Sequence, residues 1–162
     1  MRIGFYLNGR HRAIDTDSGT PLSGILEMTA DDSDRADTFI AASGCGEGKC
    51  GRCLVIIDGE VLHSCLIPGF SIRNKNITTF SGFRKTKDYE YIRDGFKEAG
   101  YDPCRLCLPG RVLTAHTLLK RHTIPGDEQI LEGFEVVKCH CSGYTPFHEG
   151  VKTAARIRRM YE

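Results

Sequence analysis

The sequence predicts an α+β protein whose first half mixes strands with helix and whose second half is helical. Three observations predict this: alternating apolar residues with two hairpin turns before residue 80, apolar residues at helical spacing after residue 88, and eight cysteines that fall in two sets, one in each half. Halves of about 80 residues have small cores and usually need additional cross-links. The cysteine sets are therefore expected to bind metal and to cross-link each half.

Composition narrows the class of protein. Of the 162 residues, 40% are hydrophobic and 27% are charged, which is typical of a soluble globular chain. The balance of 22 Lys and Arg against 21 Asp and Glu gives no reason to expect a nucleic acid or a membrane surface as partner. The longest apolar run, Cys53–Ile57, is too short to span a bilayer, and no secretory signal is visible. A cytoplasmic location is expected, where clustered cysteines more often bind metal than form disulfides.

Two β-hairpins are predicted in the first half. Apolar residues alternate from Ile3 to Leu7, and Asn8-Gly9 follows at once. Asn-Gly favours a type I′ turn, so the chain is expected to return as a strand over 10–16. The runs Leu54–Ile57 and Val61-Leu62 flank a second turn of this kind, at positions 58 and 59.

One short helix and one surface loop are expected between the hairpins. Thr20-Pro21 is typical of a helix start, with Thr20 as N-cap and Pro21 as the first helical residue. Leu22, Ile25 and Leu26 supply the apolar face of this helix. The acid-rich stretch 29–37 is interpreted as a surface excursion.

A basic, glycine-containing segment, Ser81–Lys87, is interpreted as a linker between a domain over 1–80 and a domain over 88–162. Four helices are expected in the second domain. The first carries Tyr91, Ile92 and Phe96 and ends near Gly100. The second opens at Pro109 and ends near residue 122, and two more are expected over about 127–134 and 146–160.

The first cysteine set has the spacing of a plant-type [2Fe–2S] site. Cys45, Cys50 and Cys53 follow the pattern C-x4-C-x2-C, and Cys65 comes after eleven further residues. The second predicted hairpin pairs position 53 with position 64, which brings Cys53 and Cys65 to the same end of a ladder. Only one C-x2-C pair is present here, whereas zinc sites usually have two.

A loop that wraps closely around an anionic cluster needs residues that tolerate positive φ and leave room for the backbone. Four glycines in this loop meet that need, and Gly46, Gly48 and Gly51 in particular are predicted to cradle the cluster, with Gly44 before them. A disulfide interpretation would leave these glycines unexplained.

The second cysteine set pairs Cys104-x2-Cys107 with Cys139-x-Cys141, with 31 residues between the two pairs. This spacing alone fits either zinc or an iron–sulfur cluster. Both pairs precede predicted helices, and helix N-termini favour an anionic thiolate cluster. His140, between the last two cysteines, is interpreted as a spacer and not as a ligand.

With both sets in view, the chain resembles the small iron–sulfur subunit of the xanthine dehydrogenase family of molybdenum hydroxylases, which includes aerobic carbon-monoxide dehydrogenase. The resemblance covers nearly the whole chain and has all eight cysteine positions in order. It rests on Leu7-Asn8-Gly9, Gly44-Cys45-Gly46-x-Gly48-x-Cys50-Gly51-x-Cys53, Ser64-Cys65-Leu66, Cys104-x2-Cys107-x-Pro109-Gly110 and Cys139-x-Cys141-x-Gly143-Tyr144.

The resemblance implies a β-grasp ferredoxin-like domain followed by an all-α four-helix domain, each holding one [2Fe–2S] cluster on its four cysteines. It implies that electrons leave a molybdenum–pterin centre in a large subunit, pass through the second cluster and then the first, and continue to a flavin (FAD) subunit or another acceptor. No side chain of this chain is expected to act as a catalytic acid, base or nucleophile. Two alternatives stay open: a free-standing two-cluster electron carrier, and a single-cluster protein with structural zinc in the helical domain.

Six positions depart from the family pattern: Pro103, Arg105, Leu106, Leu108, His140 and Ser142. Pro103 stands where the family usually has a glutamine whose amide contacts the pterin, and Arg105 stands where the family has a glycine. A proline offers neither a side-chain amide nor a backbone N–H. We hypothesise that Arg105, with its five N–H donors, supplies the missing contact; the alternative is that Arg105 is a solvated surface cation.

Overall fold

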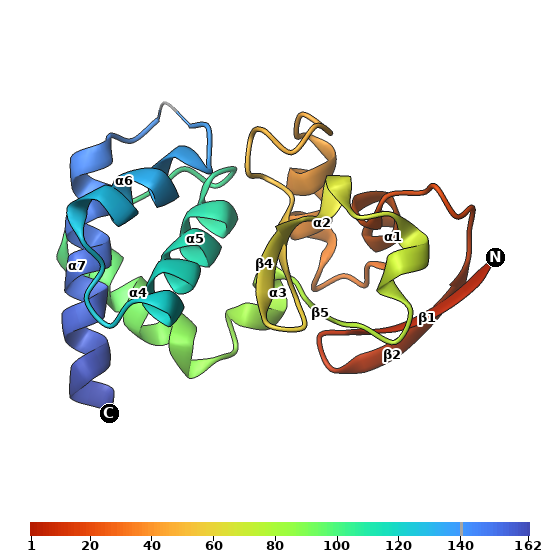
Figure 1. The fold of residues 1–162 in the computed structure, drawn as a ribbon, viewed down its shortest axis with the longest axis horizontal. Coiled ribbons are helices and arrows are strands. Elements are labelled where there is room, and N and C mark those ends of the chain that lie inside the picture. Colours follow the sequence, from red (N-terminus) through yellow and green to blue (C-terminus); the bar gives the residue numbers. More distant parts are fainter. Residues whose placement is uncertain (140) are drawn as a thin grey trace. The chain divides into compact units, whose positions relative to one another are not determined.

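The computed structural model describes residues 1–139 and 141–162 and divides into two compact units, Met1–Phe83 and Arg84–Glu162. Figure 1 shows a small sheet with short helices in the first unit and only helices in the second. The α+β prediction is therefore confirmed. Among the described residues, no helix is long and apolar enough to cross a membrane.

The first unit is built on a mixed five-stranded sheet with the order β2-β1-β5-β3-β4. The strands are β1 (Arg2–Leu7), β2 (Arg10–Asp15), β3 (Leu54–Ile57), β4 (Glu60–His63) and β5 (Asn76–Thr78). Both predicted hairpins are confirmed, and the turn residues Asn8, Gly9, Asp58 and Gly59 have φ of 49°, 80°, 48° and 90°. Two positive φ angles in a two-residue turn define type I′.

Strand β5 joins the two hairpins into one sheet, because it pairs parallel with β1 and antiparallel with β3. Helix α1 (Leu22–Thr29) packs on this sheet through the predicted residues Leu22, Ile25 and Leu26. The shared core contains these three together with Ile3, Phe5, Leu7, Val55, Ile57, Ile72 and Ile77. The predicted cap is wrong: Pro21, not Thr20, is the N-cap residue, and Thr20 instead accepts a hydrogen bond from Thr16.

The acid-rich stretch predicted as a surface excursion is also partly wrong. Helix α2 (Arg35–Ala42) starts within it, and Asp34, just before the helix, is only 3% exposed. The Asp34 carboxylate accepts hydrogen bonds from Asn8 Nδ2 at 3.0 Å, Thr79 Oγ1 at 3.1 Å and Ser81 Oγ at 2.5 Å. This buried network connects the first hairpin turn, α2 and the end of the first unit.

The remaining elements of the first unit are the 3₁₀ helices η1 (Ser64–Leu66) and η2 (Gly69–Ile72) and the single helical turn α3 (Phe80–Phe83). Phe80 and Phe83 are buried, so the linker prediction is wrong for its first three residues. The aromatic side chains explain the difference, because their burial keeps this segment packed on the first unit.

The second unit contains four helices: α4 (Lys87–Glu98), α5 (Leu108–Arg121), α6 (Asp127–Glu135) and α7 (Tyr144–Tyr161). All four were predicted, with boundaries within about two residues, and Gly100 after α4 has the positive φ of a helix terminator. Helices α4 and α7 pack closely at a glycine, since a Cβ on Gly95 would lie 2.5 Å from the backbone nitrogen of Ala154.

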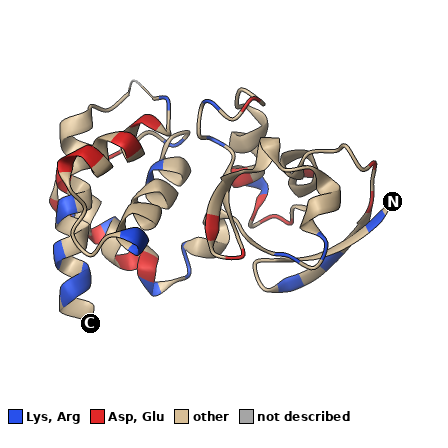
Figure 2. Cartoon of the chain, viewed as in Figure 1, with Lys and Arg blue, Asp and Glu red and all other residues tan. Residues whose placement is uncertain are grey.

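Figure 2 shows acidic residues along α6 and basic residues along α7. Part of this charge is paired between the two helices: Asp127 Oδ1 lies 3.1 Å from Lys152 Nζ and 2.8 Å from His148 Nε2. Asp127 also stands in the first turn of α6, where a negative charge favours the helix dipole.

Candidate metal centres

The first cysteine set lies on the loop between α2 and β3 and on η1. The glycines predicted to cradle a cluster do adopt left-handed backbone, with φ of 69° at Gly46, 69° at Gly48 and 76° at Gly51. Gly44 has a different reason to lack a side chain, since a Cβ there would lie 3.0 Å from the Cys50 sulfur. The backbone of this loop therefore approaches the cysteines as closely as the prediction required.

This loop points its backbone N–H groups at sulfur. The amides of Glu47, Lys49 and Cys50 donate to Cys45 Sγ over 3.4, 3.3 and 3.4 Å. The Gly48 amide donates to Cys65 Sγ over 3.2 Å. These donors lower the pKa of Cys45 to about 6, because they stabilise the thiolate. A thiolate is the form that binds metal, so the loop is preorganised for ligation at Cys45.

The other two cysteines of this set meet at the end of the β3–β4 hairpin. The Ser64 amide donates to the Cys53 carbonyl over 3.0 Å, which is the pairing of positions 53 and 64 that the sequence predicts. Burial raises the pKa of Cys53 to about 11, and the neighbouring Cys65 thiol contributes to the same shift. The first set is thus arranged as two pairs, Cys45 with Cys50 and Cys53 with Cys65. It is not a single compact group.

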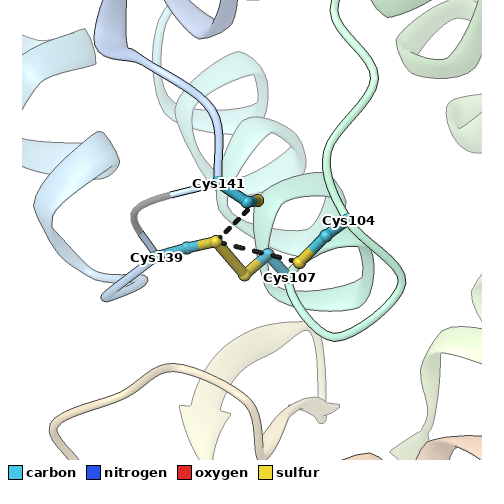
Figure 3. A group of neighbouring side chains, drawn as sticks. All are labelled: Cys104, Cys107, Cys139 and Cys141. Atoms are coloured by element: carbon cyan, nitrogen blue, oxygen red, sulfur yellow. Dashed lines mark hydrogen bonds between the residues drawn. A yellow bond between two sulfur atoms is a disulfide. The ribbon is translucent and has the colours of Figure 1, made fainter.

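The second cysteine set is compact. The sulfur atoms of Cys104, Cys107, Cys139 and Cys141 all lie within 4.8 Å of one another, and Figure 3 shows them pointing toward a common centre. Cys104 and Cys139 sulfurs are 3.8 Å apart, and those of Cys139 and Cys141 are 2.9 Å apart. Cys107 and Cys139 are joined as a disulfide, so this bond must first be reduced by two electrons, as by a thiol reductant, to give the two thiolates that bind metal.

Helix starts position this second set, as predicted. Cys107 is the N-cap residue of α5, and its amide donates to the Cys104 carbonyl over 2.9 Å. Cys141 comes shortly before the N-cap of α7, Gly143. The backbone amide of Cys104 lowers the pKa of Cys141 by donating to its sulfur. His140, interpreted as a spacer, lies outside the described residues.

Comparison with known proteins agrees with this geometry. Residues 79–152 match the family model of a [2Fe–2S] binding domain. The chain is 32% identical to the nicotinate dehydrogenase small FeS subunit of Eubacterium barkeri, over 95% of this chain and 94% of that protein. It is 36% identical to one of the nicotinate dehydrogenase subunits of Pseudomonas putida, over 72% of this chain and 74% of that one.

The chain belongs to the small [2Fe–2S] iron–sulfur subunits of the xanthine dehydrogenase family. It is therefore an iron–sulfur subunit of an oxidoreductase, with [2Fe–2S] centres as its cofactors. The fold agrees: quinoline 2-oxidoreductase from Pseudomonas putida 86 superposes with a TM-score of 0.78 over 99% of this chain and 96% of that chain, at 24% identity. Aldehyde oxidoreductase from Desulfovibrio desulfuricans superposes with a TM-score of 0.77 at 25% identity, and this chain covers 17% of that longer chain.

Two of the residues that depart from the family pattern, Pro103 and Arg105, differ in burial. Pro103 is buried and lines a cavity of about 360 Å³ together with Phe96, Tyr101 and Val112. Arg105 is exposed, so its guanidinium is available to a partner.

Sequence reasoning missed one residue beside the second set. Arg111, in the first turn of α5, is fully buried. A signal was present, because a cation in the first turn of a helix opposes the helix dipole and is usually avoided there.

Proposed function

We propose that this chain is the electron-transfer subunit of a molybdenum hydroxylase complex. When bound, each [2Fe–2S] cluster supplies a site that accepts and releases one electron. The observation that supports this most directly is the compact group of four sulfurs at the start of α5, inside the segment that matches a [2Fe–2S] binding domain. That match also favours iron over the structural zinc that four cysteines would otherwise fit.

Two clusters are proposed, one in each half of the chain. The helical domain, residues 88–162, would hold one on Cys104, Cys107, Cys139 and Cys141. The ferredoxin-like domain, residues 1–80, would hold the other on Cys45, Cys50, Cys53 and Cys65. The pairing of these last four sulfurs supports the second assignment, because a [2Fe–2S] core binds two thiolates at each iron. Gly46, Gly48 and Gly51 would cradle that cluster with backbone close to sulfur.

The proposal includes a direction for the electrons. They would leave a molybdenum–pterin centre in a large partner subunit, pass through the site on Cys104, Cys107, Cys139 and Cys141, then through the site on Cys45, Cys50, Cys53 and Cys65, and reach an FAD subunit. The Mus musculus xanthine dehydrogenase/oxidase, of which this chain covers 9% at 32% identity, is an example of a relative in which the matching region is a small part of a larger enzyme. A cytoplasmic location fits because its reducing conditions would open the Cys107–Cys139 disulfide and supply all eight cysteines as thiols when the clusters assemble.

Purification of the native protein through a tag on the chromosomal gene tests this function. The proposal predicts that a large partner chain is purified with it and that the complex contains molybdenum and pterin, measured by elemental analysis and by fluorescence of the oxidised pterin. A chain that purifies alone, with its clusters in place and no molybdenum, would instead be a free-standing electron carrier.

A further inference from the structure

One charged side chain in the second unit is buried without an opposite charge. Arg111 is 0% exposed, and no carboxylate of the described residues lies within ion-pair distance of it. A guanidinium stays protonated even when buried, so the charge cannot be removed by titration. Buried charges in proteins are normally paired or bound to metal sites.

The contacts of Arg111 satisfy only some of the hydrogen-bond donors of its guanidinium. Nη1 donates to the Phe134 carbonyl over 2.5 Å, and Cζ lies 3.9 Å from the centre of the Phe134 ring and 5.2 Å from that of Phe147. Nε and Nη2 are also buried, and neither has a hydrogen-bond partner among residues 1–139 and 141–162. Aromatic faces stabilise a cation, but they do not replace a counter-charge for the three N–H donors on Nε and Nη2.

The second cysteine set is the nearby source of negative charge. Arg111 lies one turn after Cys107 on α5, and its amide donates to the Cys107 carbonyl over 2.9 Å. The ring centres of Tyr101 and Phe147 are 5.8 Å apart, and the Ser142 hydroxyl donates to the Tyr101 hydroxyl over 3.4 Å. Burial lowers the pKa of Arg111, while Tyr101, Cys141 and Cys104, in that order, act in the opposite direction.

We propose that Arg111 is the buried counter-cation of the [2Fe–2S] cluster held by Cys104, Cys107, Cys139 and Cys141. The inference rests on the proposed ligand set. A [2Fe–2S] core on four thiolates is a dianion when oxidised and a trianion after it gains one electron, so a fixed cation beside it stabilises the reduced state more than the oxidised state. Arg111 therefore raises the reduction potential of this cluster.

A role in packing alone makes a different prediction. If Arg111 only fills space between Phe134 and Phe147, an uncharged side chain of similar length serves equally well for the redox equilibrium. The test must therefore separate charge from volume. Arg111→Lys keeps the charge, Arg111→Gln keeps polarity without charge, and Arg111→Met keeps an unbranched apolar side chain.

Arg158 offers a matched control within the same unit. It is also an arginine that donates to backbone carbonyls, those of Leu119, His122 and Thr123. These partners lie at the C-terminal end of α5, whereas the cysteines lie at its N-terminal end, roughly 20 Å away for a helix of 14 residues. Arg158→Gln should leave the potential of the second cluster unchanged.

The experiment is a redox titration of the full-length, cluster-loaded chain, followed by electron paramagnetic resonance. Arg111→Gln and Arg111→Met should lower the equilibrium constant for reduction of the second cluster about tenfold or more, which is about 59 mV for a one-electron couple. Arg111→Lys should stay close to the wild-type potential, and the signal of the first cluster should not move in any variant.

Unchanged potentials in Arg111→Gln and Arg111→Met would overturn the proposal and leave the ligand set intact. If neutral variants fail to retain the second cluster, retention by Arg111→Lys supports the role of the charge, while equal loss in Arg111→Lys assigns the residue to packing and overturns it. A wild-type chain without a second cluster signal would overturn the ligand set itself, before any variant is compared.

Discussion

At the scale of residues, single buried polar side chains such as Asp34 connect segments that are far apart in the sequence. Asp34 gathers three side-chain donors, from Asn8, Thr79 and Ser81, at a position that is 3% exposed. Hydrogen bonds to a carboxylate are roughly twice as strong as bonds between neutral groups. Because α2 follows this residue directly and ends at the loop of the first cysteine set, Asp34 fixes one end of the element that presents the ligands.

Replacement of Asp34 tests that role. Asp34→Ala removes the charged acceptor that three side-chain donors share, although Ser81 Oγ keeps Asp37 Oδ2 and Asn8 Nδ2 keeps Thr79 Oγ1, and should lower the free energy of unfolding by about 2 kcal/mol. Asp32 is the matched control, because its side chain is 96% exposed and lies 3.4 Å from Arg35 in a surface ion pair. Asp32→Ala should cost no more than about 0.5 kcal/mol. Urea denaturation measures both variants, and equal shifts of the midpoint would mean that the Asp34 network contributes no more than the surface pair.

Arg105 is the residue through which this chain is expected to differ from its relatives at the partner interface. The structure exposes Arg105 and buries Pro103, so the arginine is the side chain able to reach outward. If it supplies a hydrogen bond to a buried polar group of the large subunit, Arg105→Ala should cost about 1–3 kcal/mol, which lowers the affinity for that subunit roughly 5- to 150-fold. Isothermal titration calorimetry with the isolated large subunit measures this.

The exposed Arg159, near the end of α7, serves as the control for that measurement. Arg159→Ala should leave the affinity unchanged. An Arg105→Ala variant that binds as tightly as the control would identify Arg105 as an ordinary surface cation.

At the scale of elements, the sequence predicts those strands, turns and helices that are determined by residues close together in the chain. Asn8-Gly9 and Asp58-Gly59 determine their turns within two residues, so both hairpins could be predicted. Strand β5 was not predicted, because its three residues become a strand only by pairing with β1 and β3. Helix α2 was missed for a similar reason: its acid-rich start looks exposed until Asp34 finds partners far away in the chain.

In the candidate site, too, features with a local cause could be predicted and features that depend on distant contacts could not. All eight cysteines could be assigned to two sets from spacing, and three glycines of the first loop adopt the positive φ expected of them. Arg111 could not be placed, since its position beside the second set depends on Phe134 and Phe147 from other helices. A residue such as Arg111, whose role depends on contacts with residues far away in the sequence, cannot be recognised from the spacing of residues next to it.

Close packing between helices gives a prediction at this scale. A Cβ on Gly95 would meet the backbone of Ala154 at 2.5 Å, and backbone cannot move aside without separating α4 from α7. Gly95→Ala should therefore destabilise the chain by roughly 2–3 kcal/mol. Gly24, in α1, is the control: its nearest neighbour would be 3.5 Å away, so Gly24→Ala should stabilise the chain by about 0.5–1 kcal/mol. Thermal unfolding should show shifts of opposite sign, and shifts of the same sign would contradict the packing argument.

At the scale of the molecule, the two units are expected to assemble their clusters independently. Each has its own core and its own four cysteines. Cys50→Ser should impair the cluster of the first unit, because an alcohol replaces one thiolate of the set, and should leave the signal of the second cluster at full intensity. Electron paramagnetic resonance of the dithionite-reduced variant checks this. Loss of both signals from a chain whose helical unit stays folded by circular dichroism would show that the sites depend on each other.

The metal content of the purified chain tests the central claim, that eight cysteines hold two [2Fe–2S] clusters. Iron, zinc and acid-labile sulfide are measured per chain, together with the electron paramagnetic resonance of the reduced protein. The account predicts about four irons, about four sulfides and two distinct signals. About two irons, about two sulfides and one zinc would contradict it and assign a structural metal to the helical unit instead.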